Sequence, residues 1–187
     1  MSGIALHLMR HGAPARPGLL LGHRDEPALP SEIARCVARA EGLAFDRVVS
    51  SDLSRTHDPA ARIAAARGLE HRVDPDWREL DFGDWTGLAA AEVDPAAYAR
   101  FWQDPDAHAP PGGERWSALR ARVERALAGI TVPSLVLTHG GAMRAALAVL
   151  FHMEQPQVWA FDLPYASVLS LRLWPGEGAQ ITGLVTA

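Results

Sequence analysis

Short apolar segments alternate along the chain with longer amphipathic or alanine-rich segments. The apolar segments predict strands at residues 4–9, 46–51, 69–74, 134–139, 166–174 and 180–186. Helical periodicity predicts helices within residues 30–43, 52–68, 114–128 and 141–152. The last two strands are expected to pair across residues 175–179, whereas residues 76–87 and 104–114 have the composition of loops. Strands that alternate with helices predict an α/β fold, a sheet with helices packed on its faces.

Two helix starts depend on individual residues. Ser31 can serve as the N-cap of the first helix. In the second helix Pro59 lacks the amide hydrogen and crowds the carbonyl of Arg55. Either that helix kinks at Pro59, or a first turn near Asp52 gives way to a new start capped by Asp58.

Composition narrows the class of protein. The chain has 187 residues, of which 48% are hydrophobic, and we expect one globular domain over residues 1–187. A net charge of −4 gives no overall attraction to nucleic acid or to an anionic membrane. No apolar run is long enough to cross a bilayer, and the single Cys36 is typical of a reducing compartment. We therefore expect a cytoplasmic protein, and the sequence leaves open whether it is a monomer or a homodimer.

Polar residues follow three of the predicted strands at the points where those strands end. These residues are Arg10, His11 and Gly12 after the first strand, Ser50, Ser51 and Arg55 after the second, and His139, Gly140 and Gly141 after the fourth. The carboxyl ends of parallel strands meet at one edge of a sheet, where ligands bind. If these three strands are neighbours, two histidines and two arginines share one pocket.

Such a pocket suits phosphate. Arginine offers a planar fork to two oxygens, and helix N-termini at the same edge add free N–H groups. Gly12 and Gly140, beside the two histidines, allow the backbone to approach an anion closely. A neutral imidazole held against the phosphorus can accept the phosphoryl group, which water then removes.

The departing alcohol needs a proton, and the stretch DWRELDFGDWTG offers three carboxyl groups among aromatic residues. They are Glu79, Asp81 and Asp84. Packing against aromatic rings desolvates a carboxyl group and lets it hold a proton near neutral pH. Physical chemistry alone does not choose among the three.

Four motifs occur in the order that marks a known family. LMRHG, SSDLSR, RELDFGDWTG and THGGAMRA resemble those of the histidine phosphatase superfamily, which has the phosphoglycerate mutase-like fold. The resemblance implies a three-layer α/β/α sandwich around a mostly parallel sheet with an antiparallel edge strand. It implies that His11 is phosphorylated, that Arg10, Arg55 and His139 hold the phosphoryl oxygens, and that Glu79 donates the proton. It also places Glu114, in PPGGE, near the pocket rim, and it implies no metal or organic cofactor.

Within the superfamily, the segment GHRDEPAL and the short stretch between Glu79 and His139 are most similar to the alpha-ribazole phosphatase branch. Phosphoglycerate mutases carry longer insertions that shield the phosphohistidine, so the resemblance favours hydrolysis. Ala13-Pro14 and GLLLG depart from the family pattern on the substrate side. A loop with Leu19, Leu20 and Leu21 favours an apolar or aromatic leaving group over a small polar sugar acid.

Other interpretations compete with these. A mutase would retain the phosphohistidine, a silent phosphate-binding module would not need Glu79, and metal-dependent hydrolysis lacks a compact ligand cluster. Trp116, Leu119 and Val123 are expected in the core. The roles of His57 and Asp58 stay undecided. A solvated helix face is expected from Arg115, Arg120, Arg122 and Arg125 together with Glu114 and Glu124.

Overall fold

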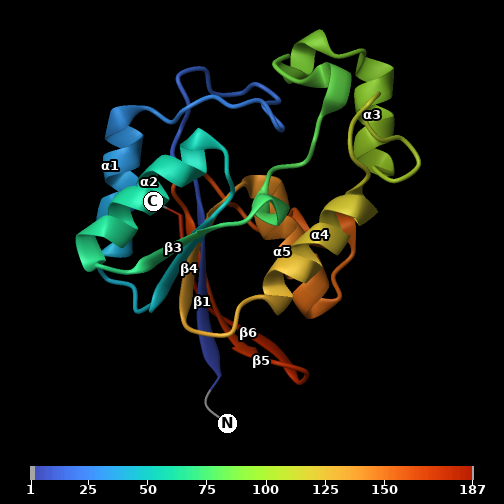
Figure 1. Ribbon diagram of the computed structural model, residues 1–187. Helices are drawn as coiled ribbons and strands as arrows, with labels where there is room; N and C mark the ends of the chain where they lie inside the picture. The colour runs from blue at the N-terminus through green and yellow to red at the C-terminus, as the bar shows by residue number, and fades with distance from the viewer. Residues whose placement is uncertain (1–2, 187) are drawn as a thin grey trace.

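The computed structural model describes residues 3–186, in three layers around a six-stranded sheet (Figure 1). The first and last residues of the domain predicted over 1–187 therefore lie outside the described part. The strands are β1 (Ile4–Arg10), β2 (Arg47–Ser50), β3 (Glu70–Val73), β4 (Ser134–Thr138), β5 (Val168–Trp174) and β6 (Gly178–Val185). The helices are α1 (Pro30–Ala40), α2 (Ser54–Arg67), α3 (Pro95–Gln103), α4 (Trp116–Ala128), α5 (Gly140–Phe151) and α6 (Gln155–Val158).

The sheet has the strand order β3-β2-β4-β1-β5-β6. β2, β4 and β1 are parallel neighbours, so the three strands that end in polar residues lie side by side, as predicted. β5 runs antiparallel to β1 and to β6. The predicted fold class is confirmed, with one difference in detail: the strand that opposes the others lies one place inside the edge, because β6 pairs along its outer side.

Alternate residues of the central strands face two separate cores. Leu6 and Val136 pack on the side of α4 and α5, and Leu135 and Leu137 pack on the side of α1 and α2. Side chains that alternate along a strand serve both faces, which explains the nearly continuous apolar runs of β1 and β4. Because both faces of these strands are buried, the strands cannot shift along the sheet. The residues that follow them are therefore held in place at its edge.

The helix α2 runs continuously through Pro59, and Asp58 caps no new start. Its N-terminus is instead held by Asp25, whose Oδ1 accepts hydrogen bonds from the amide and hydroxyl of Ser54 at 2.8 and 2.6 Å. Leu53 occupies the N-cap position. Of the two alternatives offered by the sequence, the new start capped by Asp58 was wrong, and the carboxylate that holds the N-terminus comes from a segment distant in sequence.

The N-cap predicted for α1 was also wrong. Leu29 occupies that position without a side-chain bond, Pro30 begins the helix, and Ser31 lies inside the first turn. The fixed φ of proline suits a first helical position, where the missing amide hydrogen has no partner to lose. α4 begins at Trp116, two residues after the predicted start at Glu114, and that shift frees Glu114 for other contacts.

The chain between β3 and α4 crosses the carboxyl ends of the strands. It contains α3 and three short 3-10 helices at Pro75–Trp77, Gly83–Trp85 and Ala90–Glu92. Figure 1 shows α3 standing beyond the sheet, above α4 and α5. This segment forms one wall of the pocket described below. Among the described residues, no helix has the length and apolar character needed to cross a membrane.

Candidate active site

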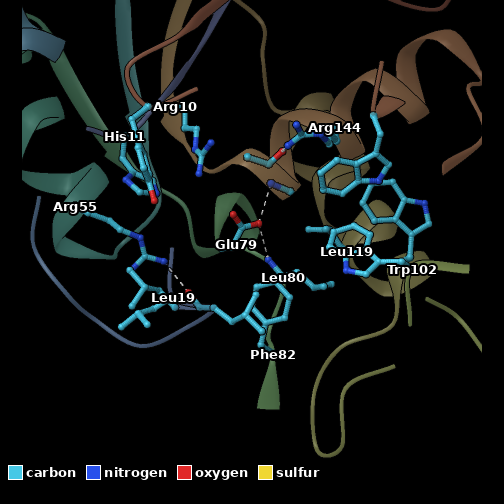
Figure 2. Close-up of a pocket in the computed structure, with 18 of the residues that line it drawn as sticks. Arg10, His11, Leu19, Arg55, Glu79, Leu80, Phe82, Trp102, Leu119 and Arg144 are labelled. Atoms are coloured by element: carbon cyan, nitrogen blue, oxygen red, sulfur yellow. Dashed lines mark hydrogen bonds between the residues drawn. The ribbon is translucent and has the colours of Figure 1, made fainter. Parts of the chain in front are cut away.

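A cavity of about 310 Å³ opens at the carboxyl ends of β1, β2 and β4. Arg10, His11, Arg55, Glu79 and Gly140 line it, although they come from five separate elements and loops. Figure 2 shows Arg10, His11 and Arg55 at one end, Glu79 in the middle and the ring of Trp102 at the far end. The cavity therefore has a cationic end, a carboxyl group and an aromatic end.

His11 presents one ring nitrogen to this cavity. Its Nδ1 lies 2.7 Å from the carbonyl oxygen of Gly12, and since a carbonyl only accepts, Nδ1 carries the hydrogen. Nε2 is then the nitrogen with a free electron pair. Burial, together with the charges of Arg55 and Arg10, holds the pKa of His11 well below its usual value. The imidazole is therefore neutral and nucleophilic at neutral pH.

His139 lies behind His11, fully buried and outside the cavity lining. The two rings meet edge to face, with centroids 5.1 Å apart. Nδ1 of His139 accepts a hydrogen bond from Nε of Arg55 at 3.3 Å, so Nε2 carries the hydrogen and donates to Ser51 Oγ at 2.9 Å. Burial and the nearby Arg55 keep the pKa of His139 well below its usual value. This neutral ring thus orients the guanidinium of Arg55.

Arg10 and Arg55 have no carboxylate partner among the residues that the structure describes. Arg55 donates to the carbonyl oxygens of Arg24 and Gly22, each at 2.7 Å. Arg10 donates to the carbonyl of Leu163 at 2.7 Å and lies over the ring of Tyr165, while its Nε is buried without an acceptor. By contrast, Arg78 pairs with Asp52. Two cations without an ion-pair partner and an unused donor at one end of a cavity have the chemistry that suits an anion.

Glu79 is fixed through one of its two carboxyl oxygens. Oε1 accepts hydrogen bonds from the amides of Gly141, at 2.9 Å, and Leu80, at 3.0 Å (Figure 2), while no residue of the described chain forms such a bond with Oε2. Gly141 lies at the N-terminus of α5, where amide groups are free to bond a side chain. One oxygen is thus anchored and the other is available to carry a proton toward the cavity.

The two other carboxylates of this loop point away from the cavity. Asp81 accepts a hydrogen bond from the Gly83 amide and lies 3.6 Å from the ring of His23. Asp84 belongs to the 3-10 helix Gly83–Trp85 and, like Asp81, is outside the cavity lining. Of the three carboxyl groups that the sequence left open, Glu79 alone reaches the cavity.

The glycines have different reasons for being glycine. A Cβ on Gly141 would lie 2.1 Å from Oε1 of Glu79, and one on Gly140 would lie 3.2 Å from Nη1 of Arg144. Gly140 lines the cavity, as predicted for a residue that contacts the ligand. Gly12 does not: a Cβ there would lie 2.6 Å from the side chain of Glu32 in α1, so its small size serves helix packing.

Much of the rest of the cavity wall is apolar. Leu19, Leu20 and Leu21 line it, as the sequence suggested, with Leu19 on the side of Arg55 (Figure 2). Leu20 is held there by backbone hydrogen bonds to Gly87 and Leu88. The remaining large apolar side chains of this wall are Leu80, Phe82, Trp102, Trp116, Leu119 and Trp159. The rings of Trp102 and Trp159 meet edge to face at 4.6 Å. An organic group attached to the phosphate would lie among these side chains.

Sequence reasoning missed three residues that shape the site, Tyr165, Arg144 and Arg122, and it named Ser51 at the strand end without a role. Tyr165 and Arg144 line the cavity, Ser51 orients His139, and Arg122 binds the loop that carries Glu79. Arg144 and Ser51 lie inside motifs that were already identified, so their positions gave a signal. Nothing in the sequence distinguishes Tyr165 or Arg122 from a surface residue.

Two expectations for residues around the site need correction. Arg122 is buried against Glu114, so neither belongs to the solvated face predicted for α4. Glu114 supports the Glu79 loop from outside the cavity lining rather than standing at the pocket rim. His57, whose role the sequence left undecided, contacts Asp58 and the ring of His71 and is not among the residues that line the cavity. Within residues 3–186, no group of three or more His, Cys, Asp or Glu side chains has an arrangement that could hold a metal ion.

The chain matches the model of a known family, described as histidine phosphatase superfamily (branch 1), over residues 6–184. A protein described as bifunctional from Mycobacterium tuberculosis is 35% identical over 185 residues, covering 94% of this chain and 49% of that protein. The chain thus spans about half the length of that relative. The adenosylcobalamin/alpha-ribazole phosphatase of Escherichia coli is 29% identical over 173 residues, covering 83% of each chain. The solved structure of a mycobacterial glucosyl-3-phosphoglycerate phosphatase aligns with a TM-score of 0.83 at 26% identity, covering 96% of this chain and 97% of the other.

Proposed function

The chain belongs to the histidine phosphatase superfamily, and on that basis we propose that it is a metal-independent phosphatase that hydrolyses a phosphate monoester through a phosphohistidine on His11. One observation carries the proposal. The neutral His11 ring holds its hydrogen on Nδ1 and turns Nε2 toward a cavity end with two unpaired arginines. A dianionic phosphoryl group between Arg10 and Arg55 would bring phosphorus to that nitrogen.

In the first step the electron pair of Nε2 forms a bond to phosphorus while the bond to the ester oxygen breaks. The leaving oxygen takes the proton held on Oε2 of Glu79 and departs as the alcohol. Charge that develops on the ring is stabilised by the hydrogen bond from Nδ1 to the carbonyl of Gly12. His139 acts through Arg55, whose Nε it holds, and the phosphoryl oxygens occupy the remaining donors of Arg55 and Arg10.

In the second step water attacks the phosphorus, and the bond from phosphorus to Nε2 breaks. The carboxylate of Glu79 takes the proton from that water, which returns the acid to its starting state. Inorganic phosphate then leaves the arginines, and the ring of His11 is neutral again. Over the cycle Glu79 gives one proton and takes one back, and His11 forms one bond to phosphorus and loses it again.

For the substrate we propose a small metabolite with an apolar or aromatic organic group, alpha-ribazole phosphate or a related ester. The apolar wall around Leu20, Phe82 and Trp102 supports this class over a small polar sugar acid. The relatives are named for alpha-ribazole and for glucosyl-3-phosphoglycerate, which makes both esters the natural first comparisons.

Mutase-type phosphoryl transfer and a silent phosphate-binding module remain the alternative functions. A mutase needs a phosphohistidine that survives in water and passes its phosphoryl group to a second alcohol. A binding module has no use for an acid such as Glu79, which two amides hold at the centre of the cavity. Hydrolysis accounts for Glu79 and for the His11 ring together.

The test is acid-labile, base-stable labelling of the protein by a radioactive phosphate ester, compared with His11→Ala. We expect label and turnover in the natural protein and neither in the variant. His7→Ala is the matched control, since His7 lies on the strand that leads to His11 and bonds Ser170 outside the cavity lining. Unchanged turnover by His11→Ala would refute the mechanism, and stable label without release would favour the mutase.

Two further measurements define the reaction class. Turnover in excess chelator is expected to persist, and loss of activity on chelation would contradict metal independence. A screen should include alpha-ribazole phosphate, glucosyl-3-phosphoglycerate, 3-phosphoglycerate and aryl phosphates. Preference for 3-phosphoglycerate over the aryl esters would contradict the proposed substrate class.

A further inference from the structure

The guanidinium of Arg122 uses all five of its N–H donors. Nε and one donor of Nη2 bind the two carboxyl oxygens of Glu114, each at 2.8 Å. The other three donors bind carbonyl oxygens of one short loop: those of Asp76 at 2.9 Å, Arg78 at 2.7 Å and Glu79 at 2.7 Å. An arginine with every donor satisfied in a buried position holds its partners in one geometry.

The loop held in this way carries the carboxyl group at the centre of the cavity. The carbonyl of Glu79 accepts from Arg122 and also lies 2.9 Å from Nε2 of His23, so two side chains fix it. The carboxyl end of the same residue is fixed by the amide of Gly141. Glu79 is therefore held at both ends, and Arg122 provides the link between its backbone and helix α4.

Glu114 completes the arrangement. It neutralises Arg122, and its backbone and side chain bind the loop one step further on, through the carbonyl and the amide of Asp81 at 2.9 and 3.3 Å. The charge of Arg122 contributes to lowering the pKa of His139, after burial and the charges of Arg55 and His11. Toward Glu79 the hydrogen bonds of the pair act through position.

We propose that Arg122, paired with Glu114, is a positioning residue that sets the carboxyl group of Glu79 in place for proton transfer to the leaving oxygen. This proposal rests on the proposed function, in which Glu79 is the proton donor. Proton donation matters most for esters whose alcohol leaves poorly and little for an activated aryl ester. Misplacing Glu79 therefore lowers activity mainly on esters with poor leaving groups, whereas a general loss of structure lowers it on all esters.

The experiment is a series of phosphate esters with leaving groups of increasing pKa, from 4-nitrophenyl phosphate through phenyl phosphate to an alkyl phosphate. For Arg122→Met we expect nearly unchanged kcat/KM on 4-nitrophenyl phosphate and a loss of about tenfold or more on the alkyl ester. Arg122→Lys keeps the charge beside Glu114 but has fewer hydrogen-bond donors. We expect its kcat/KM on the alkyl ester to lie between those of the natural protein and Arg122→Met. Arg125→Met is the matched control. Arg125 lies on the same helix as Arg122 but is exposed, and its guanidinium binds the side chain of Asp76 rather than the carbonyl groups of the loop.

Thermal unfolding shows whether each variant folds. If Arg122→Met does not, Arg122→Gln combined with Glu114→Gln takes its place, since it leaves no buried charge unpaired. Equal loss on all esters would overturn the proposal, because it would assign Arg122 a purely structural role. The proposal would also be overturned if kcat/KM of the Arg122 variants depended on the pKa of the leaving group with the same slope as in the natural protein.

Glu79→Gln separates this proposal from the proposed function. If Glu79→Gln steepens the dependence on leaving-group pKa and the Arg122 variants do not, the proposal alone fails. If Glu79→Gln shows no such dependence, the assignment of Glu79 as proton donor fails, and the proposal fails with it. In the double variant Arg122→Met, Glu79→Gln we expect the slope of Glu79→Gln alone, because an acid that is absent cannot be misplaced.

Discussion

Replacing Gly141 with alanine is expected to disable proton donation while leaving the phosphate end of the cavity intact. The added Cβ would lie 2.1 Å from Oε1 of Glu79. Ordinary contacts of a methyl carbon with oxygen begin at about 3.4 Å, so the carboxyl group must move by more than about 1 Å. A displacement of that size in a catalytic group reduces rate by roughly 100-fold, or about 2.7 kcal/mol of transition-state stabilisation.

The assay compares kcat/KM on an alkyl phosphate with kcat/KM on 4-nitrophenyl phosphate. The loss for Gly141→Ala should be confined largely to the alkyl ester, because the activated ester needs little help from an acid. Gly140→Ala should reduce activity on both esters, since its Cβ would meet Arg144 and Arg10 beside the phosphate. Gly42→Ala, where nothing lies within 4 Å of the added carbon, serves as the neutral control. Full alkyl phosphatase activity in Gly141→Ala would refute the assignment of Glu79 as proton donor.

Three further predictions concern the aromatic end, the buried histidines and the cysteine. Trp159→Ala removes the ring that meets Trp102, and we expect KM for aryl phosphates to rise about fivefold with little change for small alkyl esters; equal effects on both would contradict the aromatic subsite. The pKa values of His11 and His139 lie well below the usual value, so below about pH 6.5 the unfolded chain binds protons that the folded chain does not. As the pH is lowered below about 6.5, the free energy of unfolding should therefore decrease by up to about 1.4 kcal/mol per pH unit for each ring. Urea titrations between pH 7 and pH 5 measure this decrease, and a free energy of unfolding that does not change over that range would contradict it. Burial raises the pKa of the Cys36 thiol to about 11, so it should react with thiol reagents only after unfolding, and rapid reaction of the native protein would count against the fold around α1.

The meeting of Arg10, His11 and Arg55 at one edge of the sheet could be predicted from the sequence because it rests on local patterns. Periodicity marks the six strands and four of the helices, and residues that directly follow a strand are carried to the edge of the sheet with it. The cavity lining by Leu20 could be anticipated in the same way. Each of these inferences needs only the few residues around the position concerned. Glu79 is different, because the residues alone left three carboxyl groups open and the resemblance to the family singled it out, and the helices α3 and α6 were not predicted.

Apart from the N-cap of α1, where the adjacent Pro30 begins the helix, the errors arose where a contact joins segments that are distant in sequence. The cap of α2 comes from Asp25, and the partners of Arg122 lie on a loop more than forty positions earlier in the chain. Periodicity correctly placed Arg122 on a helix, but the neighbouring arginines made that face resemble a solvated one. A buried ion pair leaves no local pattern, and tertiary structure alone reveals it.

The position of β1 has a consequence for how the molecule is made. Among the six strands of the sheet β1 is synthesised first, yet its two neighbours in the sheet are residues 134–138 and 168–173. Contacts between residues so far apart in sequence form slowly, because a long loop must close before they can be made. On a ribosome, residues up to Leu173 must emerge before the strand that precedes His11 is paired on both sides. We therefore expect phosphatase activity to appear with the last step of folding, and any chain that stops before β5 to lack it.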